Sequence, residues 1–258
     1  MAIHPTAVID PTAEIDPAAA VGPYALIGPR VRVGAGTEVM GHVFIDKDTE
    51  IGERCRIFPF ASLGADPQDM KYAGERSRLV LGDGVVVRES ATVHRGTAGG
   101  GGVTRVGDGT LVMATVHVAH DCQIGRNVIL SSYAVLAGHV QVGDRAIVSG
   151  SSAVHQFCRL GAHSFLGGMT GVTKDVPPYM IAAGVRDKDM VVAPNAVGLR
   201  RSGFSREALD AITGAHRLLH NRSPLADVLA EVEERFPDSP EVKVMLDFYR
   251  SSERGVYR

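Results

Sequence analysis

An aliphatic residue recurs at every sixth position along the first two thirds of the chain. The series runs from Ile3 to Leu63 without a polar interruption and resumes in the same phase at Leu81. After a second break it restarts at Val106, and it ends at Val172. A short, constant period of this kind is typical of repeat architectures. Six residues hold a short β-segment and a turn, so the aliphatic side chains of successive repeats stack inward. The pattern predicts a parallel β-helix.

The other positions of the repeat support this prediction. The residue after the aliphatic is often Gly, as at Gly22 and Gly34, and we expect it to adopt unusual backbone angles at a corner. Proline recurs one position later, as at Pro5, Pro11 and Pro23, where it suits a turn and would break an α-helix. A helical interpretation of this region is therefore excluded.

Two interruptions and a change of pattern divide the chain. Residues 65–80 and 98–105 are polar or Gly-rich and are predicted to leave the β-helix as loops, where binding groups tend to lie. From about residue 204 the six-residue period gives way to helical apolar stripes, with Ser223 before Pro224 and Ser239 before Pro240 as expected N-caps. We predict a β-helix domain over residues 1–190 and a C-terminal α-helical domain over residues 191–258.

Composition narrows the classes of protein. The chain has 258 residues, with 27 basic and 29 acidic side chains, and this balance gives no reason to expect a nucleic-acid partner. No leader-like or transmembrane-length apolar segment is present, so we expect a cytoplasmic protein. Cys55, Cys122 and Cys158 all occupy the small fifth position of the repeat, which predicts buried packing residues and no disulfide.

Four histidines occupy positions of the repeat that are expected to point outward, namely His117, His120, His139 and His155. We expect their side chains to line one outer groove. A neutral histidine serves as a general base or as a metal ligand. The pair His120-Asp121 offers a base with a carboxylate that orients it. The spacing of His117 and His120 gives no shared face on a β-coil, so we expect no metal, although a zinc protein stays an alternative.

Several motifs resemble one family, the UDP-N-acetylglucosamine O-acyltransferases of lipid A synthesis in Gram-negative bacteria. The similarity spans nearly the whole chain, and its motifs are MKYAGE at 70–75, VHRGT at 93–97, HVAHDC at 117–122, LAGHV at 136–140, AVHQFC at 153–158, DVPPYMIAAG at 175–184 and GFSREA at 203–208. The resemblance implies a mainly β fold, a left-handed parallel β-helix with 18-residue coils and a C-terminal helical domain. It also implies a homotrimer with active sites between neighbouring subunits.

The resemblance assigns a chemical role to several residues. His120 would deprotonate the glucosamine 3-hydroxyl, Asp121 would orient it, and the Gly138 N–H would bind the oxyanion. The donor would be a 3-hydroxyacyl chain on acyl carrier protein, and no cofactor is implied. The residues that would bind the nucleotide sugar and the acyl hydroxyl are Gln68, Asp69, Lys71, His117, His139, His155, Gln156, Asn195 and Arg201. Those that would set the acyl-chain length are Gly168, Phe165 and Met169.

The sequence departs from the family pattern after Gly184, where the segment up to Asn195 is about two residues longer than usual, and at Ser202, where a basic residue is expected. Arg200, Arg201 and Arg206 could dock the acidic carrier protein, or they could form a solvated face. The alternatives to O-acyl transfer are another hexapeptide acyltransferase, a zinc protein like the γ-class carbonic anhydrases, and a β-helix without catalysis. An N-acyltransferase of the same pathway would carry a domain before the repeat, whereas this repeat begins at Ile3.

Overall fold

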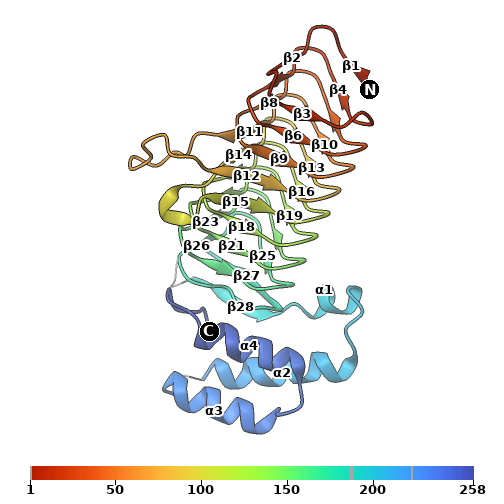
Figure 1. Cartoon of the computed structure of the whole chain (residues 1–258). Coiled ribbons are helices and arrows are strands. Elements are labelled where there is room, and N and C mark those ends of the chain that lie inside the picture. The colour runs from red at the N-terminus through yellow and green to blue at the C-terminus, as the bar shows by residue number, and fades with distance from the viewer. Residues whose placement is uncertain (1, 186–188, 222) are drawn as a thin grey trace.

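The computed structural model of the chain describes residues 2–185, 189–221 and 223–258. Short parallel strands form the three sides of a long prism, and the helices lie against its C-terminal end (Figure 1). The chain visits the three sheets in turn, so each coil contributes one strand to each side. The parallel β-helix predicted from the six-residue period is confirmed.

Most strands are only two residues long, because the other four residues of each hexad form a corner of the prism. Sheet A consists of β1 (Ala2–Ile3), β4 (Ala20–Val21), β7 (Glu38–Val39), β10 (Arg56–Ile57), β13 (Val86–Val87), β16 (Leu111–Val112), β19 (Ile129–Leu130), β22 (Ile147–Val148), β25 (Phe165–Leu166), β27 (Met180–Ala183) and β28 (Val191–Pro194). Sheet B consists of β2 (Val8–Ile9), β5 (Leu26–Ile27), β8 (Phe44–Ile45), β11 (Ser62–Ala65), β14 (Thr92–His94), β17 (His117–Val118), β20 (Val135–Leu136), β23 (Ala153–Val154) and β26 (Gly171–Val172). Sheet C consists of β3 (Glu14–Ile15), β6 (Arg32–Val33), β9 (Thr49–Ile51), β12 (Arg78–Leu81), β15 (Val103–Val106), β18 (Gln123–Ile124), β21 (Gln141–Val142) and β24 (Arg159–Leu160).

The strand register confirms that one coil contains three hexads. Val8 pairs with Leu26, and His117 pairs with Val135, in both cases 18 residues further along the chain. The aliphatic residues that define the period point inward and form the core, and the small fifth-position residues pack beside them. The three cysteines are fully buried, as predicted, and burial raises the pKa of the Cys122 thiol to about 12.

The corners show that the expectation about glycine was wrong. Gly22, Gly34 and the other second-position glycines inside the coils do not have positive φ, whereas Gly64, beside the first insertion, does (φ 72°). From Val21 onward the left-handed conformation falls on the fourth residue of most hexads, as at Asp121 (φ 62°) and His139 (φ 62°). Glycine is required at the second position because the coils approach closely there. A β-carbon on Gly22 would lie 2.6 Å from the backbone N of Gly41 on the next coil. Coil-to-coil contact therefore explains these glycines.

Both insertions leave the prism at the corner between sheets B and C. The first loop covers residues 66–77 and the second residues 95–102, so the predicted bounds of 65–80 and 98–105 were wrong, because β11, β12 and β15 extend into them. The second loop contains the 3₁₀-helix η1 (Ala98–Gly100). The backbone N–H of Ala98 donates to Glu75 Oε1 at 3.1 Å, which ties the two loops together. The first loop projects furthest from the prism (Figure 1).

The last coil passes into a helical region. β28 pairs antiparallel with β27 and so extends sheet A past residue 190, and α1 (Ala196–Arg201), α2 (Arg206–Leu219), α3 (Leu225–Arg235) and α4 (Pro240–Arg250) follow. Ser239 caps α4 as predicted, but the predicted cap at Ser223 was wrong, since Pro224 itself stands at the N-cap of α3. None of the helices in the described ranges is long and apolar enough to cross a bilayer.

Candidate active site

The B–C corner concentrates the polar residues that sequence analysis selected. After the two loops, the next coils place His120 and Asp121, then Gly138 and His139, then Gln156 and Phe157 at the same corner, one coil above another. Neighbouring strands of a sheet lie about 4.8 Å apart, so side chains on successive coils meet directly. This corner, from the first loop to Phe157, is the candidate active site.

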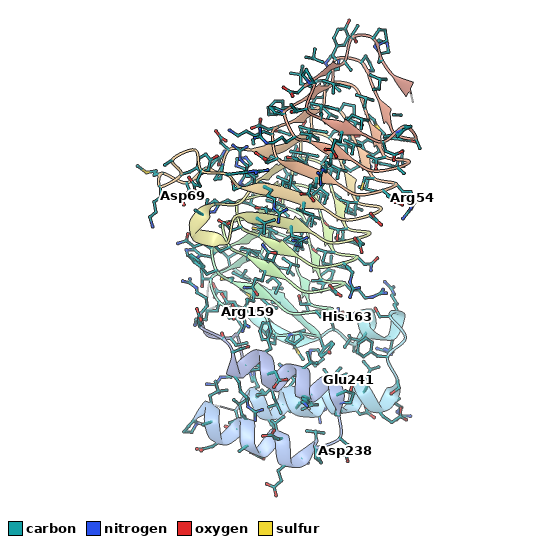
Figure 2. The ribbon with its side chains drawn as sticks, in the orientation of Figure 1. Arg54, Asp69, Arg159, His163, Asp238 and Glu241 are labelled. Atoms are coloured by element: carbon teal, nitrogen blue, oxygen red, sulfur yellow. The ribbon has the colours of Figure 1, made fainter. Side chains whose placement is uncertain are left out.

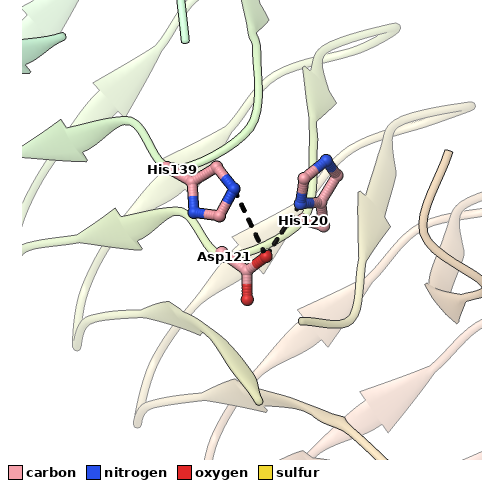
Figure 3. A group of neighbouring side chains, drawn as sticks. All are labelled: His120, Asp121 and His139. Carbon is pink, nitrogen blue, oxygen red and sulfur yellow. Dashed lines mark hydrogen bonds and ion pairs between the residues drawn. The ribbon is translucent and has the colours of Figure 1, made fainter. Parts of the chain in front are cut away.

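His120 and Asp121 form a hydrogen-bonded pair at this corner. The His120 Nδ1 atom lies 2.8 Å from Asp121 Oδ2, and the Asp121 side chain is fully buried (Figure 3). Asp121 carries no proton to donate when ionised, so Nδ1 bears the ring proton and Nε2 keeps its lone pair. The His120 side chain is 12% exposed, which leaves the ring accessible to a substrate. The pair has the form of a general base held by an orienting carboxylate.

The second loop completes the environment of the carboxylate. Asp121 Oδ1 accepts from the Thr97 backbone N–H at 2.8 Å, and Oδ2 accepts from the Thr97 hydroxyl at 2.6 Å. The Asp121 N–H donates to the Thr104 hydroxyl at 2.7 Å. A buried carboxylate is stable only with such partners. Thr97 therefore holds the Asp121 carboxylate in the rotamer that receives the His120 imidazole, and Thr104 fixes the Asp121 backbone.

Glycines pack directly against both members of the pair. A β-carbon on Gly138 would lie 2.6 Å from His120 Cε1, and a β-carbon on Gly100 would lie 2.0 Å from Asp121 Cγ. Real β-carbons do not approach other atoms so closely, so any side chain at either position would displace the ring or the carboxylate. The Gly138 N–H has no acceptor in the described part of the chain. It is available to an oxygen of a bound substrate.

His139 stands on the next coil and faces the same carboxylate. Its ring meets the His120 ring edge to face, with centroids 5.1 Å apart, and stacks on Phe157 at 4.4 Å. Burial lowers the pKa of His139, while Asp121 and Asp69 oppose this shift. His139 is thus held mostly neutral between an aromatic ring and the pair.

His120, Asp121 and His139 could together offer three ligand atoms to a metal ion. One ligand atom each from His120, Asp121 and His139 lie within 4.8 Å of one another. However, the His120 Nδ1 atom is engaged with Asp121 Oδ2, and that oxygen also accepts from Thr97. The His139 Nε2 atom lies 3.8 Å from the same oxygen. The atoms therefore converge on one another, which fits a proton-transfer pair better than a set of ligands around a cation.

A cleft of about 470 Å³ opens beside this cluster. One wall is formed by Asp121, His139 and Phe157 of the corner, and the other includes Arg159, Asp175 and residues of the C-terminal tail. The tail is the segment from Ser251 to Arg258. The cleft is large enough to receive part of a substrate next to the His120 imidazole.

Comparison with known proteins decides which family carries this site. The chain is 39% identical to the UDP-N-acetylglucosamine O-acyltransferase of Moraxella catarrhalis, with a TM-score of 0.96 over 100% of both chains. It is 38% identical to the protein of the same name from Acinetobacter baumannii, with a TM-score of 0.95 over 99% of each chain. The UDP-N-acetylglucosamine acyltransferase of Francisella novicida is 37% identical, with a TM-score of 0.95 over 99% of this chain and 94% of its own.

This chain belongs to the UDP-N-acetylglucosamine O-acyltransferase family. Family profiles agree, because that of the second domain of these enzymes matches residues 175–257, and that of the bacterial transferase hexapeptide repeats matches residues 104–138. The chain is an acyltransferase of the hexapeptide class, and its prism is a left-handed β-helix, as the resemblance implied.

The structure of this family member places the predicted site residues in two groups. The B–C corner brings together His120, Asp121, Gly138 and His139, with Gln156 beside them on the next coil and Gln68, Asp69 and Lys71 on the first loop. The second group lies on sheet A, where a cleft of about 390 Å³ is lined by Phe165, His163, Asn195 and Arg201 among others. Figure 2 shows Asp69 on one side of the prism and His163 beside α1 on another.

Several predicted residues have structural partners of their own. Asn195 caps α1 through its side-chain oxygen and donates to the His163 carbonyl at 3.0 Å, so both ends of its amide are engaged. His117 Nδ1 lies 2.7 Å from the Thr92 hydroxyl on sheet B. His117 lies on β17, His120 and His139 lie at the B–C corner, and His155 directly follows β23, so the four histidines occupy different positions of the repeat around one corner. The altered segment after Gly184 includes residues 186–188, which lie outside the described residues.

The three residues that the resemblance assigns to acyl-chain length lie near the corner between sheets A and B. Phe165 lies on the outer face of sheet A, and Gly168 and Met169 follow at the corner between sheets A and B, where Met169 is exposed. A β-carbon on Gly168 would meet only the Gly150 carbonyl oxygen, at 3.7 Å. The space over Gly168 is therefore open.

Sequence reasoning missed the residues that organise the first loop. Arg95 is fully buried beneath it and donates to the Gly64 carbonyl, to Asp46 at 3.0 Å and to the Tyr72 hydroxyl at 3.0 Å, and it also pairs with Asp66. An arginine is buried only when its charge is paired. The only sequence signal was that Arg95 and Thr97 belong to the VHRGT motif, directly before the Gly-rich insertion.

Proposed function

We propose that this enzyme transfers a 3-hydroxyacyl chain from acyl carrier protein to the 3-hydroxyl of UDP-N-acetylglucosamine, the first step of lipid A synthesis. The observation that carries the proposal is the His120–Asp121 hydrogen bond of 2.8 Å, in a pair whose His120 side chain keeps 12% of its surface exposed. Such a base activates the hydroxyl of the acceptor itself, so the enzyme needs no nucleophilic side chain. The names of the related enzymes supply the acceptor.

The proposed reaction proceeds through a tetrahedral intermediate. His120 Nε2 takes the proton of the sugar 3-hydroxyl as its oxygen bonds to the thioester carbonyl carbon, and the carbonyl oxygen becomes an oxyanion. The Gly138 N–H, which lacks an acceptor among the described residues, stabilises that oxyanion. When the intermediate collapses, the C–S bond breaks and the imidazolium returns its proton to the leaving thiolate. Asp121 stabilises the imidazolium throughout.

The outer faces of the prism support a homotrimer. The outward residues of sheet C are mostly charged or amide side chains, whereas sheet A exposes an aliphatic row from Val86 to Ile181 and sheet B exposes apolar residues such as Leu26 and Phe44. Two apolar faces on one subunit fit a closed ring in which sheet A of one subunit packs on sheet B of the next. The charged sheet C then faces solvent.

This arrangement would unite the two groups of site residues. In such a ring, the A–B corner points toward the three-fold axis, and the B–C corner of one subunit lies opposite the C–A side of its neighbour. The His120 corner would then face the sheet A cleft that Phe165 and Arg201 line. Lys71 and Arg201 carry the positive charge that suits a diphosphate. Each active site would contain residues of two subunits.

The same geometry suggests a path for the acyl chain. From the His120 corner, the chain would cross the outer face of sheet A at Phe165 and reach the A–B corner at Gly168. Because the space over Gly168 is open, we expect a long chain to be accepted. Three buried cysteines that form no disulfide fit a reducing compartment, and we place the reaction in the cytoplasm.

The decisive experiment is an acyl-transfer assay with purified protein, 3-hydroxyacyl carrier proteins of several lengths and UDP-N-acetylglucosamine. We expect O-acylated product with the wild-type chain and a loss on the order of 10²- to 10⁴-fold in kcat with His120→Ala. His4→Ala, an exposed histidine at the far end of the prism, is the matched control. Unchanged activity of the His120 variant would exclude the proposed mechanism. Stoichiometric zinc, with activity lost on chelation, would favour metal chemistry instead.

A further inference from the structure

The C-terminal tail is attached to the last coil in a way that brings it to the catalytic cleft. The Ser252 hydroxyl donates to Asp175 Oδ2 at 2.8 Å, and Asp175 forms an isolated parallel bridge with Val256. Arg159 connects both parts, since it pairs with Asp175 at 2.9 Å and donates to the Ser251 hydroxyl at 3.1 Å. Ser251, Glu253 and Arg254 consequently line the cleft that Asp121 and His139 line from the other side.

Arg254 extends from this tail to His155. Its Nη2 atom lies 3.2 Å from His155 Nδ1 and 3.1 Å from the Thr173 carbonyl oxygen. A guanidinium keeps its protons, so Nδ1 accepts from Arg254 and the His155 ring proton belongs on Nε2. His155 Nδ1 also lies 3.2 Å from the Gln156 carbonyl, but that contact would need the proton that Arg254 displaces. Arg254 and His155 therefore present neighbouring N–H donors.

The charges around the cleft leave Arg254 without a counter-ion. Asp175 is paired with Arg159, and Asp121 is satisfied by His120 and Thr97. No carboxylate in the described ranges of the chain forms an ion pair with Arg254. Glu253 lines the same cleft as an opposing charge.

We propose that Arg254, together with the His155 Nε2–H, binds a phosphate group of a substrate at this cleft. Both Nη2 protons of Arg254 are engaged by His155 and Thr173, so the Nη1 and Nε protons and the positive charge of the guanidinium would meet the phosphate oxygens. The inference rests on the proposed function, whose substrates contain phosphate in two places. One is the diphosphate of the nucleotide sugar, and the other is the phosphodiester of the carrier protein's prosthetic arm. The shared chemistry is a phosphate beside the catalytic pair.

The experiment compares Arg254→Gln and Arg254→Lys with Arg250→Gln. Arg250 lies in α4 and pairs with Glu233 away from the cleft, so its variant removes the same charge without touching the site. Ser252→Ala loosens the tail without changing charge. Steady-state kinetics give the KM for each substrate, and calorimetry gives the Kd for UDP alone. Thermal unfolding of every variant monitors the fold.

We expect Arg254→Gln to raise the KM of one substrate by about tenfold or more, with Arg254→Lys intermediate and kcat changed far less. A raised Kd for UDP assigns the phosphate to the nucleotide, whereas a raised KM for the carrier protein with normal UDP binding assigns it to the donor arm. Glu253→Gln should act in the opposite direction, by about two- to fivefold.

Equal effects of Arg254→Gln and Ser252→Ala would mean that Arg254 only anchors the tail, and would overturn the proposal. Unchanged constants for both substrates would do so as well. Failure of the wild-type chain to transfer an acyl group at all is a different outcome, because it would contradict the proposed function before any variant is compared.

Discussion

Gly138 lies so close to His120 that a β-carbon at position 138 would stand 2.6 Å from the Cε1 atom of the imidazole ring. The two residues belong to successive coils, and the His120 ring packs against the backbone of the Gly138 coil. This packing sets the direction of the His120 Nε2 lone pair. This contact connects the spacing of the β-helix to the proposed chemistry.

Gly138→Ala should therefore inactivate the enzyme without unfolding it. The new methyl group displaces the imidazole from its hydrogen bond with Asp121, and we expect kcat to fall by on the order of 10²-fold. Single-turnover transfer assays measure the loss, and UDP binding with the thermal midpoint serves as control. A variant with normal kcat would show that the ring position does not limit the reaction.

Two adjacent glycines offer a matched pair of variants in the second loop. A β-carbon on Gly100 would overlap the Asp121 carboxylate, whereas a β-carbon on Gly99 would meet nothing within 4 Å. We expect Gly100→Ala to reduce kcat strongly and Gly99→Ala to leave it within about twofold of the wild type. Similar losses in both variants would mean that loop conformation, and not the carboxylate, is responsible.

The stability of the protein should depend on pH through His94. Burial, with smaller contributions from His117 and His120, lowers the pKa of His94 to about 4 from an ordinary value near 6.5. Between these values the unfolded chain binds a proton that the folded chain does not, so stability falls as the pH is lowered through that window, by up to about 3 kcal/mol. His117 and His139 are shifted the same way by burial.

Urea unfolding between pH 7 and pH 4.5 measures this dependence. His94→Asn should flatten most of it, because the variant loses the histidine whose pKa is lowered to about 4, and a smaller slope from His117 and His139 should remain. His4→Asn, at an exposed site, is the control and should follow the wild type. A wild-type slope in the His94 variant would contradict the assignment.

Arg95 should control the order of the first loop. Arg95→Met leaves the Asp46 and Asp66 carboxylates without the buried guanidinium, and we expect a loss of stability of about 3–5 kcal/mol together with faster proteolysis between residues 66 and 77. Arg76→Met removes an exposed partner of Asp48, which Arg30 still pairs, and should cost about 1 kcal/mol or less. Equal costs in the two variants would contradict this view of Arg95.

The apolar face of sheet A should be required for assembly. Ile147→Glu places a charge in the row that we assign to the subunit interface, and we expect the trimer to dissociate, as measured by light scattering after gel filtration. Gln141→Glu places the same charge on sheet C, which we expect to face solvent, and should leave the mass unchanged. A trimeric Ile147 variant would contradict the proposed packing.

The sequence predicted the repeat region well because each hexad is a local unit. The inward aliphatic, the small fifth residue and the turn all lie within six neighbouring residues, so their pattern alone predicts the coil and the burial of Cys55, Cys122 and Cys158. The His120–Asp121 pair could be predicted for the same reason, since the two residues are consecutive in the sequence. The predictions were wrong where a residue type is required by a contact with another coil, as for the glycines that pack against the backbone of the next coil.

By itself, then, the sequence determined the period, the inward and outward faces, the helical C-terminal region and the His120–Asp121 pair. Only the tertiary structure decided what surrounds that pair. Thr97 reaches Asp121 across 24 residues, and Arg254 reaches His155 across 99. These contacts depend on the paths of a loop and a tail that carry no repeat, and a short-range pattern contains no information about where such segments end.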